Sequence, residues 1–199
     1  MEFSNFAGEI SEIQETKEQS ENIEFSKEAL DKFDKLFETG DFFRKGHNSE
    51  KEELNNEQKE EFRESTGWSD EIWDAVGSLN EAEIYMEGGL KETEINGRKC
   101  LIRDDIDLDW EDEDGITNRD RMERGRPPIT KDGEEVELHH IGQKQTSPLA
   151  ELTMEQHRGG GNDTILHDKT KETEIDRNEF GKERREHWKD RVESLKGEK

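Results

Sequence analysis

Four of the six histidines in this 199-residue chain fall within a stretch of about thirty residues. Two are adjacent, in the sequence ELHHIGQ, and two flank the sequence RGGGNDTIL: His139, His140, His157 and His167. An imidazole titrates near neutral pH, so it can accept a proton from water, and its neutral form is a common metal ligand. The cluster therefore points to a metal site, an acid–base site, or both.

The adjacent pair is expected at the end of a strand. The sequence TKDGEEVELHH predicts a turn at Asp132-Gly133 and then a strand in which Val136 and Leu138 share one face. Successive side chains of a strand point to opposite faces, so one histidine can face a cation while the other faces a substrate.

The glycine-rich segment between His157 and His167 could turn the chain so that both reach the same cation. Three imidazoles suit Zn²⁺ or another transition metal better than Mg²⁺, which prefers oxygen ligands. Histidine pairs and single loop histidines are also common as hydrogen-bonded surface residues, and spacing alone leaves that alternative open. His187 is expected to be solvated, on the polar side of the last helix.

The segments around the cluster predict several short elements. From residue 66, TGWSDEIWDAVGSL predicts a helix capped by Ser69, and NEAEIYMEGG a second helix capped by Asn80 and ended by two glycines. TEINGRKCLIR predicts a β-hairpin with a type I′ turn at Asn96-Gly97.

Two further helices are expected towards the C-terminus. A short basic helix in TNRDRMERGRPPI ends at Gly125. A longer helix begins after Asp176 and carries an apolar stripe of Phe180, Trp188, Val192 and Leu195. The acidic segment 104–115 lacks the glycine that an EF-hand loop needs at its sixth position, so a solvated connection is expected there.

Composition divides the chain. With 26% hydrophobic and 42% charged residues, and a net charge of -24, it is too polar for one compact core over its full length. Residues 1–115 hold 13 Lys and Arg against 35 Asp and Glu, a balance of -22, whereas residues 116–199 hold 17 against 19, a balance of -2. We expect an acidic, partly helical or disordered arm at 1–65, with one amphipathic helix in FSKEALDKFDKLFETG, and a folded module at 66–199.

Several classes of protein are excluded by residues that the chain lacks. Cys100 is the only cysteine, which rules out an intrachain disulfide and a cysteine-based zinc site. There is no basic segment followed by an apolar run at the N-terminus, so no signal peptide is expected. No window approaches the roughly 18 apolar residues of a membrane span, so a soluble protein without membrane insertion is predicted.

The region 117–170 resembles the LHH family of the HNH/endonuclease VII superfamily, whose members are nuclease toxin domains at the C-termini of bacterial polymorphic toxins. The residues that carry the resemblance are Leu138-His139-His140-Ile141, Gln143, the sequence SPLAELT, Glu155, His157-Arg158 and Leu166-His167. We expect the resemblance to extend over 66–192 as one module. It implies an α+β fold with a ββα-metal (His-Me finger) core, additional helices and a hairpin, preceded by the acidic arm.

The resemblance also implies roles for the histidines. His139 would bind one divalent metal ion (Zn²⁺, Mg²⁺, Mn²⁺ or Ni²⁺), His140 would be the general base, and His157 and His167 would be the other ligands by position. The wide spacing of His157 and His167 leaves the alternative that one of them is structural or contacts the phosphate.

Four other residues are candidates around that site. Arg158 and Arg126 are candidates for the substrate phosphate on charge alone. Glu137 could orient a histidine from behind the metal ligands. The superfamily's usual central asparagine has no clear counterpart, and Asn162, a candidate supporting residue, falls later than expected.

These implications define the expected function. The chain would be a metal-dependent endonuclease acting on DNA in preference to RNA, exported as part of a toxin system and active in the target-cell cytoplasm. A cognate immunity protein would neutralise it. The alternative is a non-catalytic acidic binding protein, a nucleic-acid mimic or partner-binding module with a structural metal site.

Overall fold

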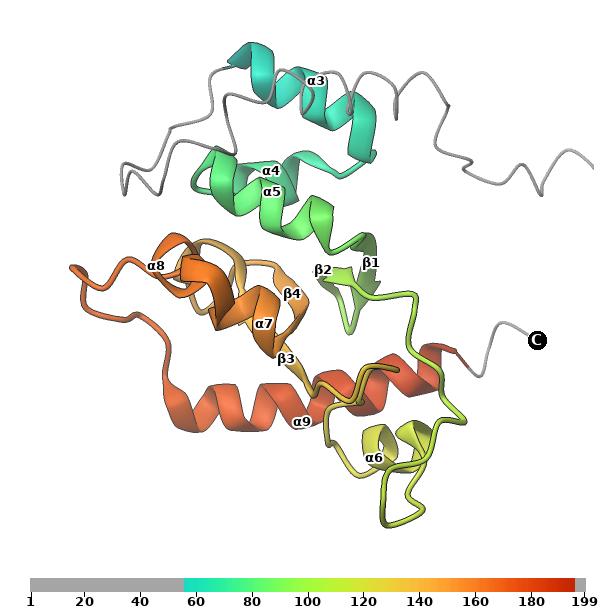
Figure 1. The fold of residues 1–199 in the computed structure, drawn as a ribbon. Coiled ribbons are helices and arrows are strands. Elements are labelled where there is room, and N and C mark those ends of the chain that lie inside the picture. The colour runs from blue at the N-terminus through green and yellow to red at the C-terminus, as the bar shows by residue number, and fades with distance from the viewer. Residues whose placement is uncertain (1–55, 196–199) are drawn as a thin grey trace, which may run out of the picture. The chain divides into compact units, whose positions relative to one another are not determined.

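A computed structural model describes residues 56–195, which belong to one compact unit, Ser49–Lys199. The predicted amphipathic helix in the arm lies outside the described residues. Within them, helices surround a four-stranded sheet, so the predicted α+β class is confirmed (Figure 1).

The sheet consists of two antiparallel hairpins in the order β1-β2-β4-β3. Its strands are β1 (Lys91–Ile95), β2 (Arg98–Ile102), β3 (Val136–His140) and β4 (Leu149–Thr153). The hairpins are joined by parallel pairing of β2 with β4 at Cys100↔Leu149 and Leu101↔Ala150. The turn predicted between β1 and β2 is confirmed, because Asn96 and Gly97 have φ of 52° and 75°, as a type I′ turn requires.

One face of the sheet is covered by an apolar cluster from the helices that precede it. These helices are α3 (Asn56–Thr66), α4 (Asp70–Ala75) and α5 (Leu79–Glu87). Trp73 of α4 is fully buried and stacks on Phe62 of α3, with ring centroids 5.9 Å apart. From the sheet, Leu101, Ala150 and Leu152 enter the same cluster. The division into an arm at 1–65 and a module at 66–199 stays a prediction.

The opposite face is covered by α6 (Asn118–Glu123) and α9 (Arg177–Ser194). Figure 1 shows α9 running beneath β3 with α6 beside it, and the two helices contact each other. Trp188 and Val192 of α9 pack with Val136 and Leu138 of β3. The side chains of Val136 and Leu138 therefore both point into this second cluster, as the alternation along β3 predicts.

Helix starts follow the residues that satisfy the first backbone N–H groups. The Asp176 carboxylate accepts hydrogen bonds from the N–H groups of Asn178 and Glu179, which confirms the predicted start of α9. The predicted start of α5 at Asn80 is wrong: the hydroxyl of Ser78 accepts from the Glu81 N–H, so the helix begins two residues earlier. Among the described helices, none combines the length and apolar character needed to cross a bilayer.

Candidate functional site

The second hairpin and the helix that follows it bring the histidines together. The helix α7 (Met154–Arg158) starts directly after β4, and its cap is Thr153, whose hydroxyl accepts from the Gln156 N–H. Because no linker separates strand from helix, α7 folds back over β3, and His157 lies against His139. The chain then passes through Gly159–Gly161 to α8 (Asn162–Leu166), and His167 is the C-cap of this helix.

His139, His157 and His167 form a triad of imidazoles. Their ring centroids are 5.0, 5.1 and 5.0 Å apart, and each offers a ring nitrogen within 4.8 Å of the other two. His139 Nδ1 and His157 Nε2 are 3.2 Å apart. Zn²⁺ holds ring nitrogens at about 2.0–2.1 Å, which puts two ligands of a tetrahedron roughly 3.3 Å apart.

The surroundings of the triad fit a cation as well. His139 is 3% exposed, and its Nε2 has no hydrogen-bond partner among the described residues, which is unusual for a buried polar atom. Burial, and then the neighbouring imidazoles, hold the pKa of His139 well below its usual value. Burial also lowers the pKa of His157, although Glu137 opposes the shift. Both rings are thus neutral at pH 7, which is the form that binds metal.

Glu137 supports the triad from behind. Its Oε2 accepts a hydrogen bond from His157 Nδ1 at 2.6 Å, which turns His157 Nε2 towards His139. The same carboxylate accepts from Arg158 Nε at 2.9 Å and from Arg158 Nη2 at 2.6 Å. The Arg158 side chain is 60% exposed, so its guanidinium lies at the rim of the triad, where solvent and ligands can reach it.

His140 lies on the other face of β3. It is 4% exposed, its ring centroid is 4.6 Å from that of Phe180 on α9, and its Nε2 lies 2.9 Å from Glu183 Oε2. That close approach lacks hydrogen-bond geometry. Burial, and then the charge of Arg98, lower the pKa of His140 to about 4, so the ring is neutral at pH 7. The structure therefore separates the adjacent histidines as strand alternation predicts.

The turn after the pair is fixed by close packing. Gly142 has a φ of +71°, and a Cβ at this position would lie 2.5 Å from the carbonyl oxygen of Ala75. The Gly142 N–H also donates to Glu81 Oε1 at 3.3 Å, and Tyr85, whose hydroxyl donates to the same carboxylate, has its ring centroid 6.4 Å from that of His139. Thus α4 and α5 hold the chain at the point where β3 ends.

Two of the candidate residues have other surroundings. Arg126 is exposed near the beginning of β3, where the Pro128 carbonyl accepts from the Val136 N–H, whereas the histidine pair is at the end of this strand. Asn162 donates through Nδ2 to the Gln156 carbonyl at 2.9 Å, which ties α8 to α7. The structure thus groups Glu137 and Arg158 with the triad, but it places Arg126 at the far end of the strand.

Sequence reasoning missed two polar residues of α9 that face the sheet, His187 and Glu183. His187 was expected to be solvated, and this is wrong: it is buried, and its Nε2 is hydrogen-bonded to Glu151 Oε1 at 2.8 Å. The available signal was spacing, since His187 lies seven residues after Phe180 and so shares its side of the helix. Glu183, beside His140, was also missed, although it lies three residues after Phe180 and so shares the same side of the helix.

A hairpin followed directly by a helix, with imidazoles from strand and helix meeting between them, is the arrangement expected of a ββα-metal nuclease core. Residues 117–194 match the model of the LHH family, described as a nuclease of the HNH/ENDO VII superfamily with conserved LHH. This match over residues 117–194 confirms the resemblance predicted from Leu138-His139-His140. No solved structure matches the chain.

Proposed function

We propose that the protein is a metal-dependent endonuclease that hydrolyses phosphodiester bonds of DNA. The observation that carries this proposal is the triad of imidazoles around one point, one residue away from a neutral, buried histidine. A metal site and a proton acceptor at the end of one strand are the two groups that phosphodiester hydrolysis by water needs.

In the proposed reaction, His139, His157 and His167 hold one divalent cation, which when bound supplies a Lewis acid for the phosphate and the leaving oxygen. His140 accepts a proton from the attacking water. The water oxygen forms a bond to phosphorus, and the bond from phosphorus to the leaving oxygen breaks. The leaving oxygen takes a proton from solvent, and His140 releases its proton to solvent. Since His139 and His140 are the last two residues of β3, a phosphate bound beyond the end of this strand would lie near both residues.

The neighbouring residues have supporting roles. Glu137 orients His157, and the exposed guanidinium of Arg158 binds the phosphate backbone of the substrate. Asn162 supports the site by holding α8, and hence His167, against α7. Arg126 is the weaker phosphate candidate and would contact the nucleic acid away from the bond that is cut.

The three nitrogen ligands favour a transition metal such as Zn²⁺ or Ni²⁺ over Mg²⁺. The cellular role we propose is that of an exported toxin effector that acts in the cytoplasm of a target cell and is neutralised by a cognate immunity protein. In this role residues 1–65 form an acidic arm or linker, and residues 66–199 form the nuclease module.

The test is a nicking assay on supercoiled plasmid with the purified full chain, titrated with Zn²⁺, Ni²⁺, Mn²⁺ and Mg²⁺ in turn. Cleavage should appear with at least one cation and disappear on chelation. A matched RNA substrate should be cut more slowly than DNA. The variant Glu186→Ala, at an exposed position of α9, is the control that should cut like the parent.

The variant His140→Ala tests the assignment of the base. It should lower cleavage by about 10²- to 10⁴-fold, the usual contribution of general base catalysis, while metal binding persists. If His140→Ala cuts as fast as the parent, the assignment is wrong. If the parent cuts with none of the four cations and instead binds basic proteins in a salt-sensitive manner, the function is that of an acidic binding protein.

A further inference from the structure

The interface between the sheet and α9 contains two histidine–glutamate pairs of opposite direction. In one, His140 of β3 faces Glu183 of α9, with 2.9 Å between Nε2 and Oε2. In the other, Glu151 of β4 faces His187 of α9, with 2.8 Å between Oε1 and Nε2. The two pairs have the same chemistry and nearly the same separation, but they differ in burial and in hydrogen bonding.

The pair of Glu151 and His187 is closed. Both side chains are 2% exposed, and the atoms that face each other are hydrogen-bonded. The second oxygen of Glu151 accepts from the backbone N–H of Arg103 at 3.0 Å. Every contact of this carboxylate is therefore with the protein interior, which is what a structural link between β4 and α9 requires.

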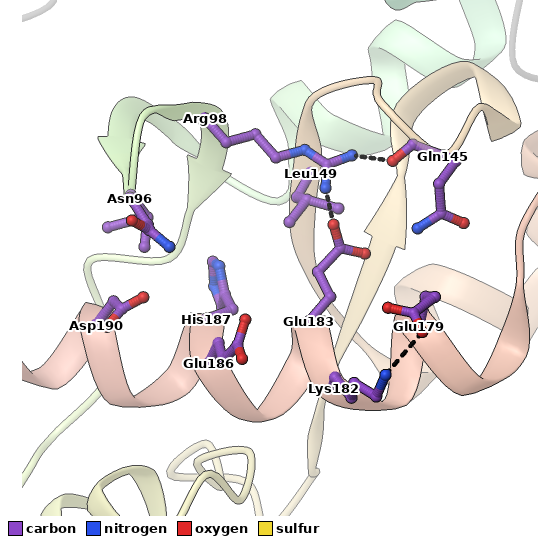
Figure 2. A pocket seen from close by; sticks show the side chains of 11 residues that line it. Asn96, Arg98, Gln145, Leu149, Glu179, Lys182, Glu183, Glu186, His187 and Asp190 are labelled. Atoms are coloured by element: carbon purple, nitrogen blue, oxygen red, sulfur yellow. Dashed lines mark hydrogen bonds and ion pairs between the residues drawn. The ribbon is translucent and has the colours of Figure 1, made fainter.

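The pair of His140 and Glu183 is open. Neither His140 Nε2 nor Glu183 Oε2 makes a hydrogen bond within the described residues, although both atoms are buried. The Glu183 side chain is 23% exposed and lines a cavity of ≈ 330 Å³ between the turn of β1 and β2 and the helix α9 (Figure 2). The cavity borders Glu183, so its carboxylate has room to rotate towards alignment with His140 Nε2.

Arg98 sets the position of Glu183. Its guanidinium donates to the carbonyl of Ser147 through Nε at 2.7 Å and to the carbonyl of Gln145 through Nη2 at 2.9 Å. From this fixed position it forms an ion pair with Glu183 Oε1, seen as a dashed line in Figure 2. One oxygen of Glu183 is thus committed to Arg98, and the other is directed at His140.

We propose that Glu183, held by Arg98, is a positioning residue for His140. It accepts a hydrogen bond from His140 Nε2–H, so the lone pair that takes the proton from water is on Nδ1. The tautomer of a histidine is set by the hydrogen bond that its other nitrogen makes. Phe180 of the same helix packs against the ring, with 4.6 Å between the ring centroids. This inference rests on the proposed function, in which His140 is the base.

The experiment uses the full chain with a DNA duplex and saturating cation. Glu183→Ala should lower kcat by about 10- to 100-fold, the usual cost of removing a residue that orients a catalytic group. The KM for DNA and the affinity for the cation should not change. Glu183→Gln, whose amide oxygen can still accept from Nε2, should restore part of kcat. Glu186→Ala, from the same cavity wall, is the matched control and should have no effect.

Two further measurements separate positioning from folding. The double variant His140→Ala with Glu183→Ala should cut no more slowly than His140→Ala alone, because Glu183 acts only through His140. Nitrogen NMR of the His140 ring should show the proton on Nε2 in the parent and a changed tautomer in Glu183→Ala and in Arg98→Ala. If the tautomer is the same in all three proteins, or if the two kcat losses multiply, the inference is overturned.

The NMR result also separates this inference from the proposed function. If the parent does not cut DNA but the tautomer depends on Glu183, then the positioning stands and the nuclease assignment fails. If the parent cuts and His140→Ala does not, yet Glu183→Ala keeps the parental kcat, then the nuclease assignment stands and the positioning fails.

Discussion

The two faces of β3 give adjacent histidines opposite surroundings. On one face, His139 meets two other imidazoles and no carboxylate, and its Nε2 is unpartnered among the described residues. On the other face, His140 meets a carboxylate and an aromatic ring from α9. In the function proposed above, this one-residue step along the strand separates the residue that would hold a cation from the residue that would accept a proton.

The supporting carboxylates differ in the same way. Glu137, two residues before His139, shares its face and acts on it through His157. Glu183 is far away in the sequence and reaches His140 only because α9 packs on the sheet. The face of β3 that carries His139, called the metal face below, is thus assembled from residues 137–167. The face that carries His140, called the α9 face below, needs the C-terminal helix and Arg98 of the first hairpin.

The largest effect that distinguishes the faces should come from His139→Ala compared with His140→Ala. Loss of one of three nitrogen ligands should weaken Zn²⁺ binding by more than the roughly 10- to 100-fold that loss of a supporting residue costs, and cleavage should fall to background. His140→Ala should bind Zn²⁺ as the parent does. Isothermal titration with Zn²⁺ measures both, and equal losses in the two variants would show that the faces are not separate.

The next effect concerns stability on the α9 face. His187→Ala leaves the buried Glu151 without its imidazole, which should lower the free energy of unfolding by about 3 kcal/mol, at the low end for a broken buried pair. The low end applies because the Arg103 N–H still donates to this carboxylate. Urea denaturation measures the change, with the exposed Glu186→Ala as control. A variant as stable as the parent would contradict a structural role for this pair.

A smaller effect is expected at Glu137, on the metal face. Glu137→Gln keeps the size of the side chain but weakens its hydrogen bond to His157, so the affinity for Zn²⁺ should fall by about 10- to 100-fold. Glu94→Gln, at an exposed position of β1, should leave the affinity unchanged. An unchanged affinity in Glu137→Gln would mean that the orientation of His157 is fixed by packing alone.

The last effect, a dependence of stability on pH, is one that both faces share and therefore does not distinguish them. Folding lowers the pKa of His139, His140 and His157 below 6.5, to about 4 for His140. Below pH 6.5 the unfolded chain therefore binds protons that the folded chain does not, so stability falls as the pH drops towards 4. The Tm of the metal-free protein, measured by calorimetry in a chelator, should decrease over this window and level off above it. The decrease should be shallower in His140→Asn.

Much of the metal face could be predicted from the sequence, because its parts are local. Strand alternation, the glycine segment and the family motif together indicated His139, His157 and His167, and the structure brings these three together. Glu137 was also indicated as a residue that could orient a histidine, and it lies two residues before His139 on the same face.

The α9 face could not be predicted in the same way, because its contacts join distant segments. Arg98 and Glu183 are 85 residues apart, and nothing local in either segment indicates that they meet. His187 was misjudged because it stands among charged residues, although its spacing from Phe180 places it on the buried side. The start of α5 was misplaced because two capping residues, Ser78 and Asn80, compete within one turn.

The parallel pairing of β2 with β4 limits how short a fragment of this chain can be and still fold without aggregating. Residues 117–194 contain β3, β4 and α9 but not β2, so a fragment with those limits would leave one edge of β4 unpaired. It would also uncover Ala150 and Leu152, which pack against α4 and α5 in the whole chain. An open, apolar strand edge is a site for intermolecular pairing and aggregation. The first hairpin is therefore a protective edge for the nuclease domain, and the smallest well-behaved folding unit is larger than the segment that carries the family motif.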